Sequence, residues 1–481
     1  MGERAFRGVG TTTAALVAAL GLLFVASGSA GSVIASPISS DPYATGGSQH
    51  AAQVEPDSFA FGNTIVATIQ TGRFFDGGSN NIAWATSTNG GKTWATGMLP
   101  GTTVYQGGPW ARISDPAVAY DPLHDVWMIS GLAIDASVSG AAVLTNRSTD
   151  GGLTWQNPVT VSTSPGTFYD KNWIVCDTWA SSPHYGNCYT EWDDSRMTMS
   201  TSTDGGLTWG PPRMPGGGGV GGQPVVQPNG NVIVPYEGGA GIRSFRSTDG
   251  GATWLASVPV ATVSEHNVNG GLRTSALPSA EVDGAGRVYV AWQDCRFRSG
   301  CPANDIVYTT SMDGVSWTTV TRVPIDPTSS GVDHFIPGFA VDRSTSGSSA
   351  HLALGYYYYP VSSCNSGTCQ LTQGFVSSLD GGATWTAPTQ VTGPMSLSWT
   401  ANTNQGRMVG DYMSTSFTAD GKAHPVFAIA KPPTGSVFAE RAATATFDPT
   451  APQISPRVPS EKWQPGHRRP ARRGSVVRRA Y

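Results

Sequence analysis

Charged and aromatic side chains occur together at several points of this 481-residue sequence. Residues 170–173 read DKNW, residues 292–297 read WQDCRF, and Arg407 is followed by Asp411 and Tyr412. Carboxylates and guanidinium groups fix the orientation of a polar ligand, and aromatic rings pack against its apolar surface. These segments therefore predict a polar-ligand pocket, provided that the fold brings them together.

The elements that must position these segments belong to a repeated unit. A short motif begins at six serines and ends at a tryptophan each time; its copies are STNGGKTW at Ser87, STDGGLTW at Ser148 and Ser202, STDGGATW at Ser247, SMDGVSW at Ser311 and SLDGGATW at Ser378. The Asp can accept backbone hydrogen bonds, and the glycines allow the positive φ values of a tight hairpin. Intervals of 45 to 67 residues are typical of a supersecondary unit repeated around a ring or along a solenoid.

Short strand patterns recur in the same order around each motif. In the second unit they are DPAVAYDP, DVWMISGLAI, AAVLTNRS and WQNPVTVS, from residue 115 to residue 162. A last unit, from residue 410 onward, lacks the motif. The fold class is therefore all-β: a single β-propeller over residues 50–449 with seven four-stranded blades, or six as the second choice.

In a four-stranded blade, the motif joins the third and fourth strands, so it shares a face with the turn between the first two. The opposite face collects the loops between second and third strands and the links between blades. The candidates on that face are Arg73, Arg112, Asp115, Asp170, Lys171, Glu191, Asp193, Asp194, Arg196, Glu237, Arg273, Asp294, Arg296, Asp333, His334, residues 356–359, Arg407, Asp411 and Tyr412. We expect the functional site there.

The S-x-D-x-G-x-T-W motif is similar to the Asp box, and six copies in a β-rich chain resemble the sialidase (neuraminidase) superfamily of propellers. The resemblance covers roughly residues 50–450. It implies a glycoside hydrolase that removes terminal sialic acid or a related acidic sugar. In that family three arginines hold the sugar carboxylate, a Tyr paired with a Glu is the nucleophile, and an Asp is the acid.

Carried onto this sequence, the resemblance implies Arg112, Arg296 and Arg407 for the carboxylate, with Asp294 beside them, and Tyr412 as the nucleophile. It implies Asp115 as the acid and Glu237 or Glu281 as the partner of the tyrosine. The match is partial. Arg112 keeps an Arg-Ile pair but lacks the following Pro, and it comes after the first Asp box instead of before it.

Two alternatives stay open. Asp boxes also occur in propellers that only bind glycans or proteins, and the same scaffold suits a hydrolase of another polysaccharide. Three arginines around one cavity would favour the sialidase reading, whereas a shallow rim lined by aromatic residues would favour binding alone.

The ends of the chain differ from its body. Arg4 and Arg7 precede an apolar run from residue 14 to residue 26, which indicates a signal peptide over residues 1–30, followed by a linker over 31–49. The run is too short to span a membrane. Residues 450–481 form a basic tail rich in Pro and Arg, which we expect to be disordered and which could contact an anionic cell surface.

The six cysteines fall into three local pairs, Cys176 with Cys188, Cys295 with Cys301, and Cys364 with Cys369, as expected for disulfides in a secreted protein. Residues 456–481 carry eight basic side chains and one acidic one within a net charge of −4, so the body is acidic. An acidic body argues against nucleic acid as a partner. The expected partner is a carbohydrate or glycoconjugate. No cofactor or metal is expected, a structural Ca²⁺ being a minor option.

Overall fold

The structure is a computed structural model that describes residues 35–44, 47–163, 168–193, 195–215, 217–239, 241–451 and 458–464. Contacts divide the chain into Met1–Ser32 and Val33–Tyr481. The first unit, with the predicted signal peptide, lies outside the described residues, as does most of the predicted basic tail. Within the described residues, no helix combines the length and apolar character that crossing a bilayer requires.

The repeated motif that ends in tryptophan forms a hairpin turn built around its third residue, an aspartate in every copy but the first. In the second copy, Asp150 accepts hydrogen bonds from the Ser148 hydroxyl (2.8 Å), from the Thr154 N–H (2.9 Å) and from the Thr154 hydroxyl (2.6 Å). Gly151 and Gly152 have φ values of 77° and 83°, which L side chains rarely adopt. The same bonds recur at Asp204 and Asp249. The motif therefore encodes a turn whose polar groups are satisfied locally.

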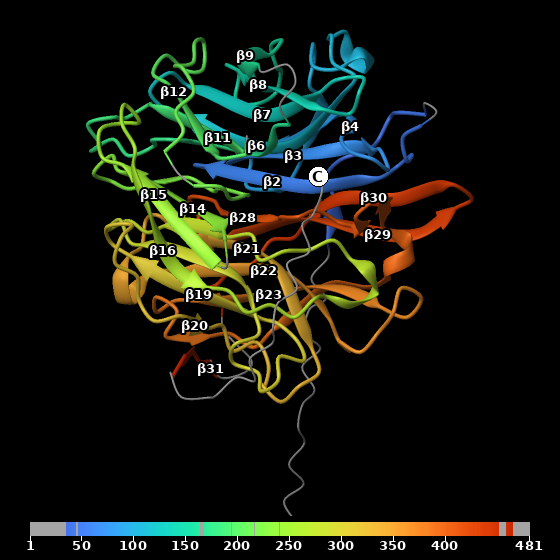
Figure 1. The fold of residues 1–481 in the computed structure, drawn as a ribbon, viewed down its shortest axis with the longest axis vertical. Helices are drawn as coiled ribbons and strands as arrows, with labels where there is room; N and C mark the ends of the chain where they lie inside the picture. The colour runs from blue at the N-terminus through green and yellow to red at the C-terminus, as the bar shows by residue number, and fades with distance from the viewer. Residues whose placement is uncertain are drawn as a thin grey trace, which may run out of the picture. The chain divides into compact units, whose positions relative to one another are not determined.

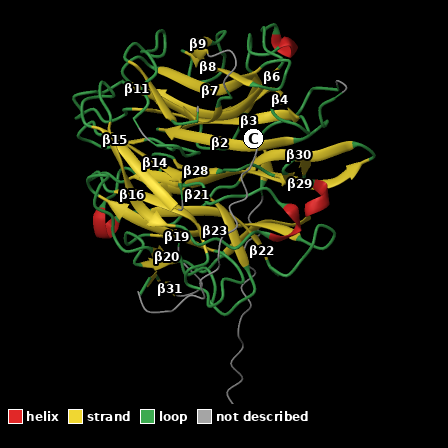
Figure 2. Cartoon of the chain, in the orientation of Figure 1, coloured by secondary structure: helices red, strands yellow, loops and turns green. Residues whose placement is uncertain are grey.

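The described chain is almost entirely antiparallel strands (Figures 1 and 2). The first two sets are β2 (Gln53–Phe61), β3 (Thr64–Arg73), β4 (Ser79–Ser87) and β5 (Ala95–Met98), then β6 (Arg112–Asp121), β7 (Val126–Ile134), β8 (Gly140–Ser148) and β9 (Val159–Thr163). The next two are β10 (Asp170–Cys176), β11 (Cys188–Asp193) and β12 (Met197–Ser202), then β13 (Val225–Val226), β14 (Val232–Gly238), β15 (Gly241–Ser247) and β16 (Leu255–Thr262).

The second half of the chain continues this order. Its sets are β17 (Ser279–Val282), β18 (Val288–Asp294), β19 (Asp305–Ser311) and β20 (Thr321–Arg322), then β21 (Asp333–Val341), β22 (Leu352–Tyr359), β23 (Gln370–Ser378) and β25 (Thr389–Ser396), then β28 (Ser414–Phe417), β29 (Ala423–Thr434) and β30 (Val437–Thr444). Smaller elements are β24 (Thr384–Trp385), β26 (Ala401–Thr403), β27 (Gly406–Met408) and the 3₁₀ turns η1 (Val104–Gln106), η2 (Asn269–Gly271), η3 (Gly347–Ser349) and η4 (Leu397–Trp399).

The sheets have a β-propeller arrangement. The first strand of each set contacts the first strand of the next, in the order β2, β6, β10, β13, β17, β21 and β28, and β28 returns to β2. Five described sheets have three to five strands; β2–β9 run as one eight-stranded sheet, because Ser79 on β4 pairs with Ile113 on β6. The all-β propeller prediction is confirmed. The count of seven or six blades stays a prediction, because this sheet joins two strand sets.

Both ends of the described chain add strands to distant sheets. β1 (Ser36–Pro37) pairs with β30, although these residues belong to the segment predicted as a linker. β31 (Val458–Pro459) pairs with β24, and β32 (Glu461–Lys462) pairs with β20. Residues 458–462, expected in the disordered tail, are thus hydrogen-bonded to the propeller. An edge strand has unpaired backbone N–H and C=O groups that can bind a further strand. Neither short segment has a hydrophobic pattern that would predict this pairing.

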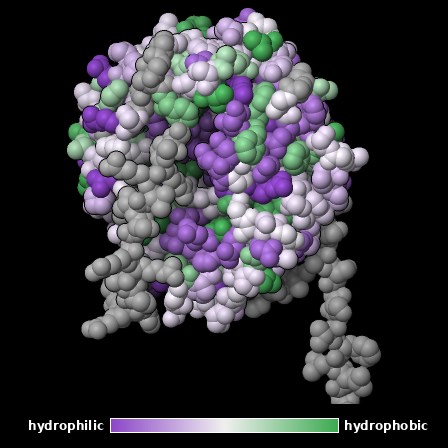
Figure 3. Space-filling model, turned by 45° about the vertical axis from the view of Figure 1, so that its right-hand side comes forward, coloured by the Kyte–Doolittle hydropathy of each residue, from purple (hydrophilic) through white to green (hydrophobic). Residues whose placement is uncertain are grey.

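All three predicted disulfides are present: Cys176–Cys188, Cys295–Cys301 and Cys364–Cys369. The first links β10 to β11 at paired positions, and the other two close loops of six and five residues. They agree with an oxidising compartment. On the face seen in Figure 3, hydrophilic residues gather over much of the surface and hydrophobic ones are scattered among them.

The Asp-box turn gives a first testable prediction. Replacing Asp150 by Ala removes an acceptor of several hydrogen bonds and should lower the free energy of unfolding by about 1–3 kcal/mol. Thr154→Val removes only the hydroxyl bond and should cost less. Urea denaturation of both variants measures the difference. An Asp150→Ala loss no larger than that of Thr154→Val would contradict the assigned role of the aspartate.

Candidate functional site

The first strands of four sets share one local distortion near the end where the link between blades enters. The register of β2, β6, β10 and β21 shifts there by a bulge. At each bulge a residue other than glycine has positive φ, namely Glu55 (53°), Asp115 (47°), Lys171 (46°) and Ile336 (51°). Such a conformation costs about 1–3 kcal/mol and is often kept at functional sites. Here the bulges bring three charged residues together.

Lys171 is the centre of a buried ionic cluster. Its Nζ lies 3.4 Å from Glu55 Oε1 and 3.3 Å from Asp115 Oδ1, and it also contacts Asp411 Oδ2. The four side chains are between 1% and 7% exposed. Arg273 donates to the same oxygen of Asp411 from the link before β17. Charges buried to this degree are tolerated only when they are paired, so each member depends on the others.

Hydrogen bonds fix the outer side of the cluster. Gln70 on β3 donates to Glu55 Oε2 and to the Ser114 hydroxyl (3.2 Å), and that hydroxyl donates to Asp115 Oδ2 at 2.7 Å. The carboxylates of two blades are thereby tied to one amide group.

The environment separates the pKa values of the carboxyl groups. Burial, with the negative charges of Asp115 and Asp411, raises the pKa of Glu55 to about 7, although Lys171 lowers it. Burial also raises the pKa of Asp170 to about 6. Burial acts in the same direction on Asp411, but Arg273 and Lys171 hold its pKa well below the usual range. At neutral pH the site thus contains carboxyl groups that can hold a proton beside one that stays ionised.

Tyr412 and Trp173 stand at the edge of this cluster. Their rings meet edge to face at 5.0 Å between centroids, and the Tyr412 hydroxyl donates to the Pro116 carbonyl at 3.1 Å. Burial and the charge of Glu55, followed by that of Asp115, raise the pKa of Tyr412 well above its usual value. The tyrosine is neutral in this arrangement and acts as a nucleophile only if a base takes its proton.

A pocket opens over these groups. It is a partly open depression of about 440 Å³ that includes open solvent, and its lining includes Lys171, Trp173, Asp411 and Tyr412. The walls are supplied by residues 221–223, 277–279, 337 and 413. The pocket therefore combines two aromatic rings with a cation and a carboxylate, groups that can contact a polar ligand.

A second cavity lies next to the first and shares Trp173, Gln223, Ser279 and Met413 with it. Its lining includes Asp57, Glu281 and Arg343. Burial raises the pKa of both Asp57 and Glu281 to about 7. Arg343 donates to the Thr178 hydroxyl at 2.6 Å and lies over the rings of Phe59 and Trp179. This cavity is a second polar space lined by the first strands.

The structure brings Asp115, Asp411 and Tyr412 together, as the sequence led us to expect. The three predicted arginines have separate partners. Arg112 bonds Asp76 (2.5 Å) and covers the Phe74 ring, and Arg407 donates to the Thr400 carbonyl at 2.8 Å. The arginine that contacts the Lys171 cluster is Arg273.

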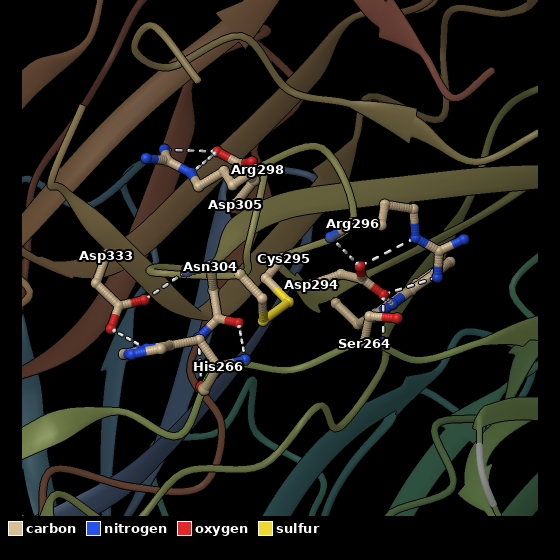
Figure 4. Close-up of a disulfide and its surroundings, with 11 residues drawn as sticks. Ser264, His266, Asp294, Cys295, Arg296, Arg298, Asn304, Asp305 and Asp333 are labelled. Carbon is tan, nitrogen blue, oxygen red and sulfur yellow. Dashed lines mark hydrogen bonds and ion pairs between the residues drawn. A yellow bond between two sulfur atoms is a disulfide. The ribbon is translucent and has the colours of Figure 1, made fainter. Parts of the chain in front are cut away.

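Asp294 and Arg296 form a bidentate pair with each other beside the Cys295–Cys301 disulfide (Figure 4). Arg296 Nε lies 3.0 Å from Asp294 Oδ1, and Asp294 Oδ2 also accepts the Ser264 N–H at 3.0 Å. Arg296 further donates to the Thr262 carbonyl. In this arrangement the pair fixes the loop after β18.

The two glutamates proposed as partners of Tyr412 lie elsewhere. Glu237 pairs through its backbone with Val220, and Glu281 lines the second cavity. The carboxyl group whose charge acts most strongly on Tyr412 is Glu55, which sequence reasoning missed. The sequence did contain a signal for Glu55. A proline follows Glu55, Asp115 and Ile336, and these three positions are equivalent in their repeat units.

One group of side chains has the geometry of a metal site among the described residues: Asp305, Asp326 and His334. Arg298 and Arg322 each contact both aspartates at 2.7–2.9 Å. Two guanidinium groups already neutralise the two carboxylates, so this arrangement is an ion-pair network and does not fit a cation.

Comparisons with known proteins found solved structures that match this chain at low sequence identity. No family model matches the chain, and no curated protein is similar in sequence. A protein of unknown function from Dyadobacter fermentans is 15% identical with a TM-score of 0.47, over 72% of this chain and 98% of that one. The NanB sialidase of Streptococcus pneumoniae is 12% identical with a TM-score of 0.43, over 86% and 70%. An α-L-arabinofuranosidase of Fusarium graminearum is 15% identical with a TM-score of 0.44, over 72% and 97%.

The charge cluster predicts how stability depends on pH. The pKa of Glu55 in the folded protein, about 7, exceeds the ordinary value of 4.5. A raised carboxyl pKa favours the folded state at low pH, and this contribution is lost as pH rises through 7. Glu55→Gln should therefore flatten the fall in the free energy of unfolding between pH 5 and 8, by up to about 1.4 kcal/mol per pH unit.

Urea denaturation at several pH values measures this slope. The exposed Glu461 provides the control, because Glu461→Gln should leave the slope of the wild type unchanged. A Glu55→Gln variant with the wild-type slope would show that Glu55 does not take up a proton in the folded protein.

Proposed function

We propose that this protein is a secreted, sialidase-like glycoside hydrolase that takes a terminal acidic sugar into the pocket over Lys171, Asp411 and Tyr412. The observation that carries the proposal is the charge arrangement under the pocket. Glu55, whose pKa is raised to about 7, and Asp411, whose pKa is held well below its usual range, both contact Lys171. Carboxyl groups with separated pKa values are the usual requirement for acid–base chemistry on a glycosidic bond.

In the proposed reaction, the ionised form of Glu55 takes the proton of Tyr412, the tyrosine oxygen bonds to the anomeric carbon, and the bond between that carbon and the leaving oxygen breaks. A base with a pKa near the working pH is the most effective one, and Glu55, with a pKa of about 7, meets this condition. The Tyr412 hydroxyl must first leave the Pro116 carbonyl, to which it donates a hydrogen bond. An amide carbonyl is too weak a base to remove the proton of a tyrosine. The leaving oxygen takes a proton from Asp115, as the resemblance implies, or from Asp170, whose pKa is raised to about 6.

Lys171 and Arg273 are the cations nearest to a bound sugar carboxylate. Both already contact Asp411, so a carboxylate in the pocket would compete with Asp411 for them. The same internal pairing favours the second candidate function, a propeller that binds glycans without cleaving them. Both cations of the cluster already have a carboxyl partner, so neither is unpaired and ready for a substrate.

We also propose seven blades and an extracellular location. The seven strand sets and the contacts around their first strands support the count. The three disulfides are consistent with export.

Release of a fluorescent aglycone from a sialic acid glycoside and from a neutral-sugar glycoside tests the proposal, between pH 5 and 8. The wild type should cleave the acidic substrate. Tyr412→Phe and Glu55→Gln should each lower kcat by about 10²–10⁴-fold, because both remove a group that acts in the transition state. Tyr358→Phe, a change of the same kind at a half-buried tyrosine outside the pocket, should retain activity.

Absence of cleavage by the wild type, together with binding of the same sugars to a glycan array, would favour the binding propeller. Cleavage that survives Tyr412→Phe would exclude the tyrosine as the nucleophile and would leave a hydrolase with a different mechanism.

A further inference from the structure

The second cavity lies at the centre of the ring of first strands. It is a partly open depression of about 540 Å³ that includes open solvent, and residues of β2, β6, β10, β13, β17, β21 and β28 line it. On β10 the first pocket is lined by residues 171–173 and the second cavity by residues 173–176. Near β17 the lining shifts in the same way, from residues 277–279 to residues 279–281. The second cavity therefore lies nearer the C-terminal ends of the first strands.

Arg343 stands at this end of the cavity, in the turn between β21 and β22. Its Nη1 donates to the Thr178 hydroxyl at 2.6 Å. The guanidinium carbon lies 5.2 Å from the ring centroid of Trp179 and 5.7 Å from that of Phe59. Phe59 itself lines the cavity. One hydrogen bond and two aromatic rings thus hold the guanidinium group beside the cavity.

The charge of Arg343 has no directly bonded counterion. Among the described residues Arg343 forms no ion pair, and Nη1 is its one nitrogen with a hydrogen-bond partner. Glu281, and then Asp177, attract it from beyond ion-pair distance. Burial raises the pKa of both acidic groups at the cavity, Asp57 and Glu281, to about 7. Below neutral pH both mainly hold a proton, so they leave the charge of Arg343 uncompensated in a half-buried position.

Apolar side chains form other parts of the cavity wall. They include the aromatic residues Phe59, Trp173 and Phe339. The hydroxyls of Ser58 and Ser414, which also line the cavity, bond to each other at 2.7 Å. Small-molecule sites typically combine an apolar wall with a few polar groups that fix the orientation of the ligand. Here the polar group without a directly bonded partner of opposite charge is a guanidinium, whose geometry matches a carboxylate.

We propose that the second cavity binds a small organic carboxylate with an apolar or aromatic body, and that Arg343 holds its carboxylate. Because Nη1 is bonded to Thr178, the donors for the ligand are Nε and Nη2, which share one edge of the guanidinium plane. Sequence analysis expected the functional site on the opposite face. Arg343, in a turn between first and second strands, was therefore not among its candidates. The inference does not depend on the glycosidase proposal.

Calorimetric titration with benzoate tests the site, at about pH 6, below the pKa of both acidic groups at the cavity. We expect saturable binding of benzoate and at least about tenfold weaker binding of benzamide, which has a similar shape without the charge. Arg343→Gln should weaken benzoate binding at least about tenfold, a loss of about 1.4 kcal/mol. Arg343→Lys keeps the charge without the planar fork and should also bind more weakly than the wild type. The exposed Arg213→Gln provides the matched control and should bind as the wild type does.

If the Arg343 variants do not fold, chemical modification of the wild type replaces them. Phenylglyoxal modifies accessible arginines, and mass mapping should show that benzoate protects Arg343 while Arg213 reacts equally with and without it. A wild type that does not bind benzoate, equal binding of benzamide, or binding that survives Arg343→Gln would overturn the proposal. So would an Arg343 that phenylglyoxal modifies equally in the presence and absence of benzoate.

Discussion

The ammonium group of Lys171 contacts three buried carboxyl groups, whose ionised forms would otherwise repel one another inside the propeller. Glu55 lies on β2, Asp115 on β6 and Asp411 in the link before β28, and each contacts Lys171 on β10. Removing one partner of such a buried arrangement typically costs about 3–5 kcal/mol, because the remaining charges stay buried without compensation. The cluster therefore couples blades far apart in the sequence, and its electrostatic balance sets which groups hold protons.

The bulges on β2, β6 and β10 explain how the cluster forms. In a regular strand, successive side chains point to opposite faces of the blade. A regular first strand therefore directs few side chains toward the first strand of a neighbouring blade. Positive φ at Glu55, Asp115 and Lys171 redirects these residues. The strain of each bulge is offset by the ion pairs that it permits, and the pocket with Tyr412 and Trp173 opens directly over the result.

Sequence reasoning found the repeated architecture because the Asp box is local: Asp150 and its neighbours satisfy one another within eight residues. It also placed Asp115, Asp411 and Tyr412 on one face, and the structure brings these residues together, since strand order decides which loops meet. It missed Glu55, and it grouped Arg296 with distant arginines, because pairing across blades depends on bulges and loop packing. Neither is visible in a motif. The pairing of residues 458–462 with β20 and β24 was concealed for the same reason.

A double-mutant cycle between Lys171 and Asp411 tests the central ion pair most directly. The free energies of unfolding of Lys171→Met, of Asp411→Asn and of the double variant give the coupling energy. The account predicts a coupling near the upper end of the range for contacting residues, about 3 kcal/mol, with the double variant more stable than the sum of the two single losses predicts. A coupling close to zero would show that the two charges do not stabilise each other, which contradicts a fold organised around Lys171.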